Sequence, residues 1–125
     1  MAYDPNDYKL LGVLKSANLN TTSDQAITIL NSSKYIVDKV VVANASANLG
    51  ASIAAGGIYS ATSKGGTVVV GAAQAYTALT AASKFATMTL ALTTDSLTAA
   101  TLYFSLTTAA GNAATCDIYI YGFPL

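Results

Sequence analysis

Apolar and polar residues alternate with a period of two in the last third of this chain, and no other feature of the sequence constrains the fold as strongly. The alternation recurs in three runs, Phe85 to Leu92, Thr101 to Thr107 and Thr115 to Phe123. In the last run, Cys116, Ile118 and Ile120 fall on one side of an extended chain, and the residues between them fall on the other. Such alternation predicts strands that are buried on one face.

The middle of the chain adds further short β-like runs. They cover residues 27–29, 35–44, 51–61 and 67–70, and Asn, Ser and Gly residues typical of turns separate them. Seven to eight short strands at this spacing predict an all-β fold, an antiparallel β-sandwich of jelly-roll-like type, over residues 25–125. Residues 72–82 combine helical spacing with threonines and a neighbouring glycine, so we expect an irregular segment, with a short helix as the alternative.

Residues 1–24 differ from the rest of the chain and predict an extended N-terminal arm. Four of the twelve charged residues lie within the first fifteen positions. The run Lys9 to Leu14 has the composition of a short strand. We expect the arm to contact another chain, because four of its apolar residues lie outside the alternating core pattern: Tyr3, Tyr8, Leu10 and Leu11. A frayed terminus is the alternative.

Composition excludes several functions. The chain has six Lys and six Asp but no Arg, Glu or His, and its net charge is zero. Without His, there is no imidazole base for a nucleophilic Ser or Cys and no histidine ligand for a metal. A neutral chain without Arg does not suit nucleic acid. We therefore expect no enzyme, no catalytic residues, no cofactor, no metal and no nucleic-acid partner.

Two long uncharged stretches, residues 40–63 and 65–83, raise the question of a membrane. Both are rich in Ala, Ser, Thr and Gly, whereas a spanning helix needs about 20 predominantly apolar residues. We therefore expect no membrane partner and no signal peptide. Cys116 is the only cysteine, and its place in an apolar run predicts a small buried side chain.

The polar side of the last run is itself aromatic. Tyr119, Tyr121 and Phe123 would stand opposite the core face of that strand. A monomer would expose this stripe, and such patches usually mark an interface. The scarcity of charge points the same way, since soluble monomers usually carry a charged surface. We expect these three residues to contact copies of the chain or a larger assembly; burial of both strand faces within one chain is the alternative.

The chain resembles a family of small structural proteins of tailed bacteriophages. The resemblance covers Leu14 to Gly122 and is carried by three segments, LKSANLNTTSDQAITILNSSKYIVDKVVVANASANLGASIAAGGIYSATSKGGT, QAYTALTAASKFATMTLAL and TLYFSLTTAAGNAATCDIYIYG. It implies a β-sandwich virion component without catalytic residues. The implied role is a capsid decoration or head-fibre protein in symmetric oligomers, most often homotrimers.

On this basis we expect a non-enzymatic capsid decoration protein that binds and stabilises the head exterior. Its partners would be copies of itself and the major capsid protein or another virion protein. It would be made in the host cytoplasm and would reside in the virion. The alternative is a tail-associated or adhesin-type module that recognises a host surface glycan.

Overall fold

The computed structural model describes residues 8–30 and 32–125, which form eight strands and no helix. The strands are β1 (Lys9–Asn18), β2 (Gln25–Thr28), β3 (Tyr35–Ala43), β4 (Ala55–Ala61), β5 (Gly65–Val70), β6 (Phe85–Thr87), β7 (Thr101–Thr108) and β8 (Thr115–Pro124). The all-β prediction is confirmed. Residues 72–82 are irregular, and the helical alternative for them is wrong. Among the described residues there is no helix that could cross a membrane.

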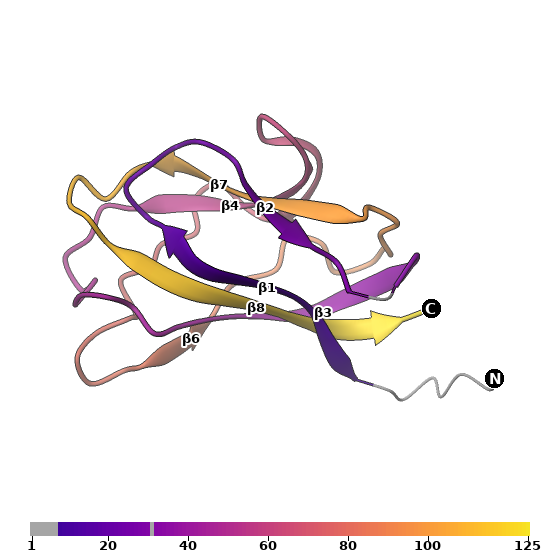
Figure 1. Cartoon of the computed structure of the whole chain (residues 1–125), viewed down its shortest axis with the longest axis horizontal. Coiled ribbons are helices and arrows are strands. Elements are labelled where there is room, and N and C mark those ends of the chain that lie inside the picture. Colours follow the sequence, from indigo (N-terminus) through magenta and orange to yellow (C-terminus); the bar gives the residue numbers. More distant parts are fainter. Residues whose placement is uncertain (1–7, 31) are drawn as a thin grey trace.

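The strands form two four-stranded antiparallel sheets, with the orders β1-β8-β3-β6 and β2-β7-β4-β5 (Figure 1). The ladder pairs are nested, so that β1 pairs with β8, β2 with β7, β3 with β6 and β4 with β5. Two further ladders, β3 with β8 and β4 with β7, join these ribbons into the sheets. This is the jelly-roll arrangement of an antiparallel sandwich, in which one long two-stranded ribbon is rolled on itself.

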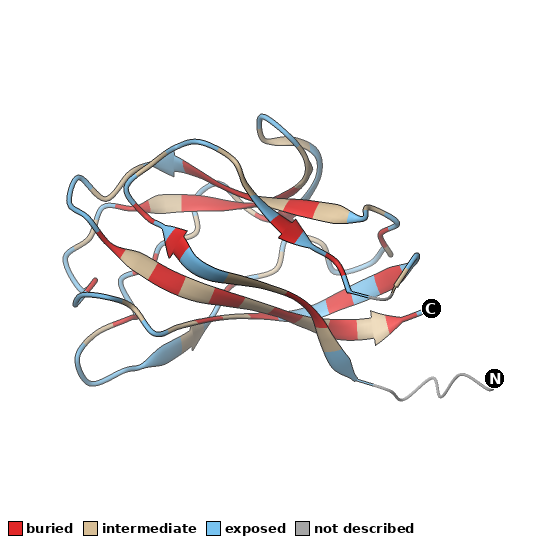
Figure 2. Cartoon of the chain, viewed as in Figure 1, coloured by how far each residue is buried: buried red, intermediate tan, exposed pale blue. Residues whose placement is uncertain are grey.

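The core lies between the sheets and follows the alternation of the sequence. Along β8, buried and half-buried residues alternate without interruption (Figure 2). Cys116, Ile118 and Ile120 are fully buried, as the sequence predicts. The two sides of this sheet therefore differ in burial, because the residues between Cys116, Ile118 and Ile120 face away from the core.

The run from Phe85 to Leu92 does not form one strand, and the prediction that it does is wrong. Only Phe85–Thr87 pairs with β3. Beyond it the Met88 N–H still donates to the Val40 carbonyl at 2.8 Å, but Leu90 bridges to Val70 of the other sheet. The segment thus passes from the first sheet to the second, and it covers the edges of both.

Residues 9–18 belong to the sandwich and not to an arm. They form β1, which pairs with β8 from Lys9↔Gly122 to Asn18↔Thr115. The separation of an arm at residues 1–24 is therefore wrong for these positions. The physical reason is that two bulges, between Leu10 and Gly12 and between Leu14 and Ala17, interrupt the alternation that marks a strand. Residues 1–7 lie outside the described residues.

A side-chain amide joins the two sheets where β1 and β2 meet. The Gln25 Oε1 accepts from the Asn18 N–H at 2.8 Å, and the Gln25 Nε2 donates to the Asn18 carbonyl at 2.8 Å. The primary amide thereby makes the two hydrogen bonds that a neighbouring strand would make. Further along, the Leu30 N–H donates to the Leu11 carbonyl at 2.7 Å. This side of the sandwich is thus also closed.

The outer face of the second sheet is partly covered by the chain itself. The tip of the β4–β5 hairpin lies against the loop before β2, where the Ser63 N–H donates to the Asp24 carboxylate at 2.8 Å. Figure 1 shows the tip of the β4–β5 hairpin above the second sheet. Tyr59 and Ser105 are buried, although the register places both on the outer side of their strands. The first sheet has no such cover among the described residues.

Close packing of β4 against β5 generates a test of the fold. A Cβ at Gly57 would collide with the backbone carbonyl oxygen of Val70, whereas a Cβ at Gly71 would have no atom within 4 Å. We expect Gly57→Ala to lower the free energy of unfolding by about 2–4 kcal/mol, since backbone must move to admit the methyl group. Gly71→Ala is the matched control and should change it by less than about 1 kcal/mol. Urea denaturation of both variants measures this, and equal effects would contradict the packing.

Candidate functional site

The outer side of β8 and its neighbours forms a continuous surface on the first sheet, here called the aromatic face. Its centre is the β8 stripe of Tyr119, Tyr121 and Phe123, each half-buried. The flanking positions are apolar in most pairs: Leu10 lies beside Tyr121, Val13 and Val41 flank Tyr119, and Ile36 lies beside Phe123. The register of three strands thus assembles residues that are far apart in the chain.

Tyr8 extends the aromatic face at one end. Its ring stacks parallel to that of Tyr121, with centroids 5.9 Å apart, and meets the ring of Phe123 edge-on at 5.2 Å. Such aromatic pairs stabilise by about 0.5–1.5 kcal/mol beyond the area that they bury. Tyr8 nevertheless stays 45% exposed. The cluster is thus ordered by its own contacts but remains open to a partner.

A bulge places one carboxylate beside this cluster. The β3–β8 register shifts between Val37 and Lys39, so that Asp38 is the extra residue on β3. Partial desolvation raises the pKa of the Tyr8 hydroxyl, and the nearby Asp38 carboxylate raises it further. Lys39 lies beside Tyr121 in the next pair. An acidic and a basic side chain, Asp38 and Lys39, therefore lie next to each other in the chain at the edge of the aromatic cluster.

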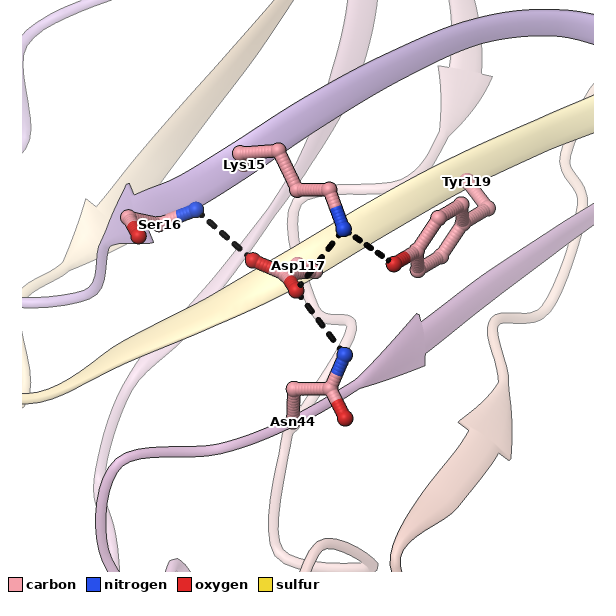
Figure 3. A network of polar contacts seen from close by, with 5 residues as sticks. All are labelled: Lys15, Ser16, Asn44, Asp117 and Tyr119. Atoms are coloured by element: carbon pink, nitrogen blue, oxygen red, sulfur yellow. Dashed lines mark hydrogen bonds and ion pairs between the residues drawn. The ribbon is translucent and has the colours of Figure 1, made fainter.

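The opposite end of the aromatic face is closed by a polar network around Asp117 (Figure 3). The Asp117 carboxylate accepts from the Ser16 N–H at 2.8 Å and from the Asn44 side-chain amide at 2.9 Å. The Lys15 ammonium lies 3.5 Å from the same carboxylate and donates to the Tyr119 hydroxyl at 2.7 Å. It also lies 5.0 Å from the centroid of the Tyr119 ring, in cation–π range.

This network holds two strained backbone positions. Ser16 and Asn44 have φ values of 52° and 54°, in the left-handed region that residues other than Gly seldom adopt. Each donates to Asp117, one through its backbone and one through its side chain. The Ser16 N–H, first, and the Asn44 amide hold the pKa of Asp117 below its usual range. Asp117 thus fixes the β1 bulge and the end of β3.

Some residues of the predicted interface lie on the aromatic face, and one lies in the core. Tyr8, Tyr119, Tyr121 and Phe123 come together on the aromatic face, and Leu10 joins them beside Tyr121. Leu11 is fully buried in the core, so its assignment to an interface is wrong; the bulge after Leu10 turns its side chain inward. Tyr3 lies outside the described residues.

Sequence reasoning missed Ile36, Val41 and Lys15 as members of this surface. Ile36 is 38% exposed next to Phe123, although it sits in a run of β-branched residues typical of a core strand. Its outward position follows from alternation with the buried Tyr35 and Val37. Pairing of β3 with β8, which the sequence does not reveal, is what brings it to the aromatic face.

Elsewhere in the described part of the chain, polar side chains come together at the hairpin tip, where Asp24 lies near Lys64 and Ser105. No group of three or more potential metal ligands occurs among these residues. Of four shallow depressions of about 350–390 Å³, three are lined mainly by Ala, Ser, Thr and Asn, and half of the residues that line the fourth are Ile, Val or Leu. Asp95 lines one of them and Lys84 another, so none of these four combines an acid with a base. The aromatic face is therefore the best candidate for function.

No protein family model, no curated protein and no solved structure matches this chain.

Loss of the Asp117 carboxylate should weaken the fold at neutral pH. We expect Asp117→Ala to lower the free energy of unfolding by about 1–3 kcal/mol, because the Ser16 N–H and the Asn44 amide both lose an acceptor. Asp95→Ala is the control, since among the described residues the Asp95 side chain accepts only from the adjacent Ser96 N–H. Urea denaturation at pH 7 measures both variants, and an equal loss in the two would contradict this role.

The same carboxylate predicts a dependence on pH. A pKa that is lowered by folding adds stability above the unfolded value of about 4, and this stability is lost as pH falls through the folded value. The difference between wild type and Asp117→Ala should therefore shrink as the pH is lowered from about 4 through the folded pKa. A difference that stays constant over this range would show that the ionised carboxylate is not what matters.

Burial of Cys116 generates a further test. Desolvation, followed by the neighbouring Asp117, raises the pKa of the Cys116 thiol to about 12. Since the thiolate is the reactive species, the thiol should resist a disulfide reagent at pH 8 in the native protein. It should react fully in denaturant, at the rate of a free cysteine. Rapid reaction under native conditions would contradict the burial of Cys116.

Proposed function

We propose that this chain is a non-enzymatic structural protein of a phage virion, a capsid decoration protein that binds the head exterior. Its partners are copies of itself and the major capsid protein or another virion protein. It is made in the host cytoplasm and acts on the assembled particle. The single observation that carries the proposal is the aromatic face, a surface suited to contact with another protein.

The chemistry of this surface favours assembly over catalysis. Aromatic residues are enriched where proteins bind one another, because each buries a large area at low entropic cost. The rings here are held by contacts within the chain, so their side chains lose little conformational entropy on binding. A protein that assembles through such a surface presents several copies to a shell at once, and multivalent binding of this kind stabilises the shell, since many weak contacts add.

Fold and resemblance support the proposal by analogy. Jelly rolls occur in viral capsid and lectin domains, and the strand order here is of that type. The resemblance of residues 14–122 to small phage structural proteins points to the first of these two settings. A fold hosts many functions, so the surface, and not the architecture, has the greater weight.

A glycan-binding module of a phage tail or adhesin is the second candidate. The observation that favours it is the rim of the Tyr8–Tyr121 stack, where Asp38 and Lys39 lie beside exposed rings. A sugar ring can pack on an aromatic face while its hydroxyls bond to a carboxylate or an amine. The absence of tryptophan from the chain weighs against this candidate.

Sedimentation with phage heads tests the decoration role. Heads isolated without this chain are mixed with the purified protein at about 1–10 µM and pelleted. We expect saturable binding at a fixed number of copies per head, and bound heads should withstand a higher temperature before rupture. No binding at these concentrations, with a folded protein, would contradict the proposal.

Titration with sugars separates the second candidate from the first. Maltotriose and N-acetylglucosamine oligomers are added while amide and aromatic NMR signals are recorded. If the chain is a decoration protein, the signals of Tyr8 and Tyr121 should stay unchanged up to about 10 mM sugar. Saturable shifts of these signals, together with no binding to heads, would favour the glycan module.

A further inference from the structure

We infer that the aromatic face binds the same face of a second copy of this chain. The inference deepens the proposed function and rests on it for the premise that the chain acts by assembly. It adds which partner the face meets, a copy of the chain and not the shell. Four observations support it: the sheet edges are partly covered, the aromatic face is exposed, its charges are balanced, and its area suits a weak pair.

The chain itself covers parts of the sheet edges on both sides of the described sandwich. The Gln25 amide and the Leu30 N–H join β2 to β1 on one side. On the other side, the segment after β6 donates from the Ala91 N–H to the Val69 carbonyl at 2.9 Å and bridges Leu90 to Val70. These contacts leave less of each edge free for a foreign strand, so a face is the larger surface open to a partner.

The two outer faces differ in how much of them the chain itself covers. The hairpin tip that binds Asp24 covers part of the second sheet, and Tyr59 is only 3% exposed there. On the first sheet, the aromatic face keeps Tyr8 45% and Ile36 38% exposed. The aromatic face thus groups several exposed apolar side chains, whereas on the outer side of the second sheet Val68, 40% exposed, lies on the edge strand β5.

The charges that border the aromatic face are balanced and favour a partner without net charge. Two lysines and two aspartates border it, at Lys15, Asp117, Asp38 and Lys39. They cancel formally, and Lys15 already pairs with Asp117. The whole chain is also neutral, with six Lys and six Asp. A second copy therefore meets the face without repulsion, whereas a strongly acidic or basic partner gains nothing from it.

The size of the face is sufficient for a weak but specific pair. Strand β8 has 10 residues, which at about 3.3 Å per residue span roughly 33 Å. Three strands about 4.8 Å apart give a flat area on the order of 500 Å² before side-chain relief is counted. A standard interface takes about 800 Å² of accessible surface from each partner. Sheets that pack face to face at about 10 Å, as within the sandwich itself, provide the geometry.

Contact between identical faces is isologous and gives a two-fold pair. The homotrimer that the phage resemblance implies would instead require the aromatic face to meet a different surface of the next copy. The mass of the assembly in solution therefore tests the geometry directly. It does so without any shell, which keeps this test separate from the test of the decoration role.

The experiment compares two matched lysine substitutions in the full chain. Ile36→Lys alters the aromatic face, and Val68→Lys alters β5 in the other sheet; the two side chains are both β-branched and are 38% and 40% exposed. Masses are measured by light scattering and sedimentation equilibrium at about 10–100 µM. Circular dichroism checks that both variants fold, and Tyr8→Lys replaces Ile36→Lys if the latter does not.

We expect wild type and Val68→Lys to have twice the chain mass of 12.7 kDa. Ile36→Lys should dissociate at least about tenfold more readily, because each pair would bury two unpartnered ammonium groups. A wild-type monomer at about 100 µM would overturn the inference, as would an Ile36→Lys variant that pairs like wild type. A trimer would overturn the two-fold geometry. In each case head binding by the same samples shows separately whether the decoration role stands.

Discussion

Strand β8 pairs with both β1 and β3, and the rest of the structure depends on this double pairing. It links the start and the end of the described chain, since Lys9 lies opposite Gly122 and Asn18 opposite Thr115. One side of β8 supplies the centre of the core, and the other supplies the centre of the aromatic face. Pairing across such long sequence separations carries a large loop-closure cost, so we expect folding to be slow for a chain of this size.

The chain covers parts of its own sheet edges, although few of its residues are charged. Soluble β proteins often protect edge strands with charged residues, but only 10% of this chain is charged. Here the Gln25 amide substitutes for a strand on one side, and the segment from Met88 to Leu92 crosses between the sheets on the other. Because parts of the edges are covered, the faces of the sandwich are the larger surfaces through which copies of the chain could associate.

Two carboxylates, Asp117 and Asp24, accept hydrogen bonds from residues whose backbone is strained. Asp117 holds Ser16 and Asn44 in left-handed conformations, and Asp24 accepts from Ser63, whose φ is 56°. Each strained residue costs on the order of 1 kcal/mol, which a hydrogen bond to a carboxylate offsets. These contacts fix the β1 bulge and the hairpin tip. They determine which sheet face is covered and which is open.

Local sequence alone determined the fold class and the two sides of the late strands. Alternation along residues 101–107 and 115–123 separates the core side from the outer side, because side chains of a strand point to opposite faces whatever the strand pairs with. The aromatic character of Tyr119, Tyr121 and Phe123 was therefore visible without coordinates. Glycines and asparagines placed most turns for the same local reason.

Which strands lie side by side depends on contacts between residues distant in sequence. Bulges and pairing register decide three features that the alternation did not indicate: β1 is a strand, Leu11 lies in the core, and Phe85 to Leu92 divides between two sheets. Both bulges and register follow from contacts distant in sequence. Tyr8, Ile36 and Lys15 reach the aromatic face for the same reason. A periodic pattern shows which side of a strand is apolar, but it carries no information about which strand lies beside it.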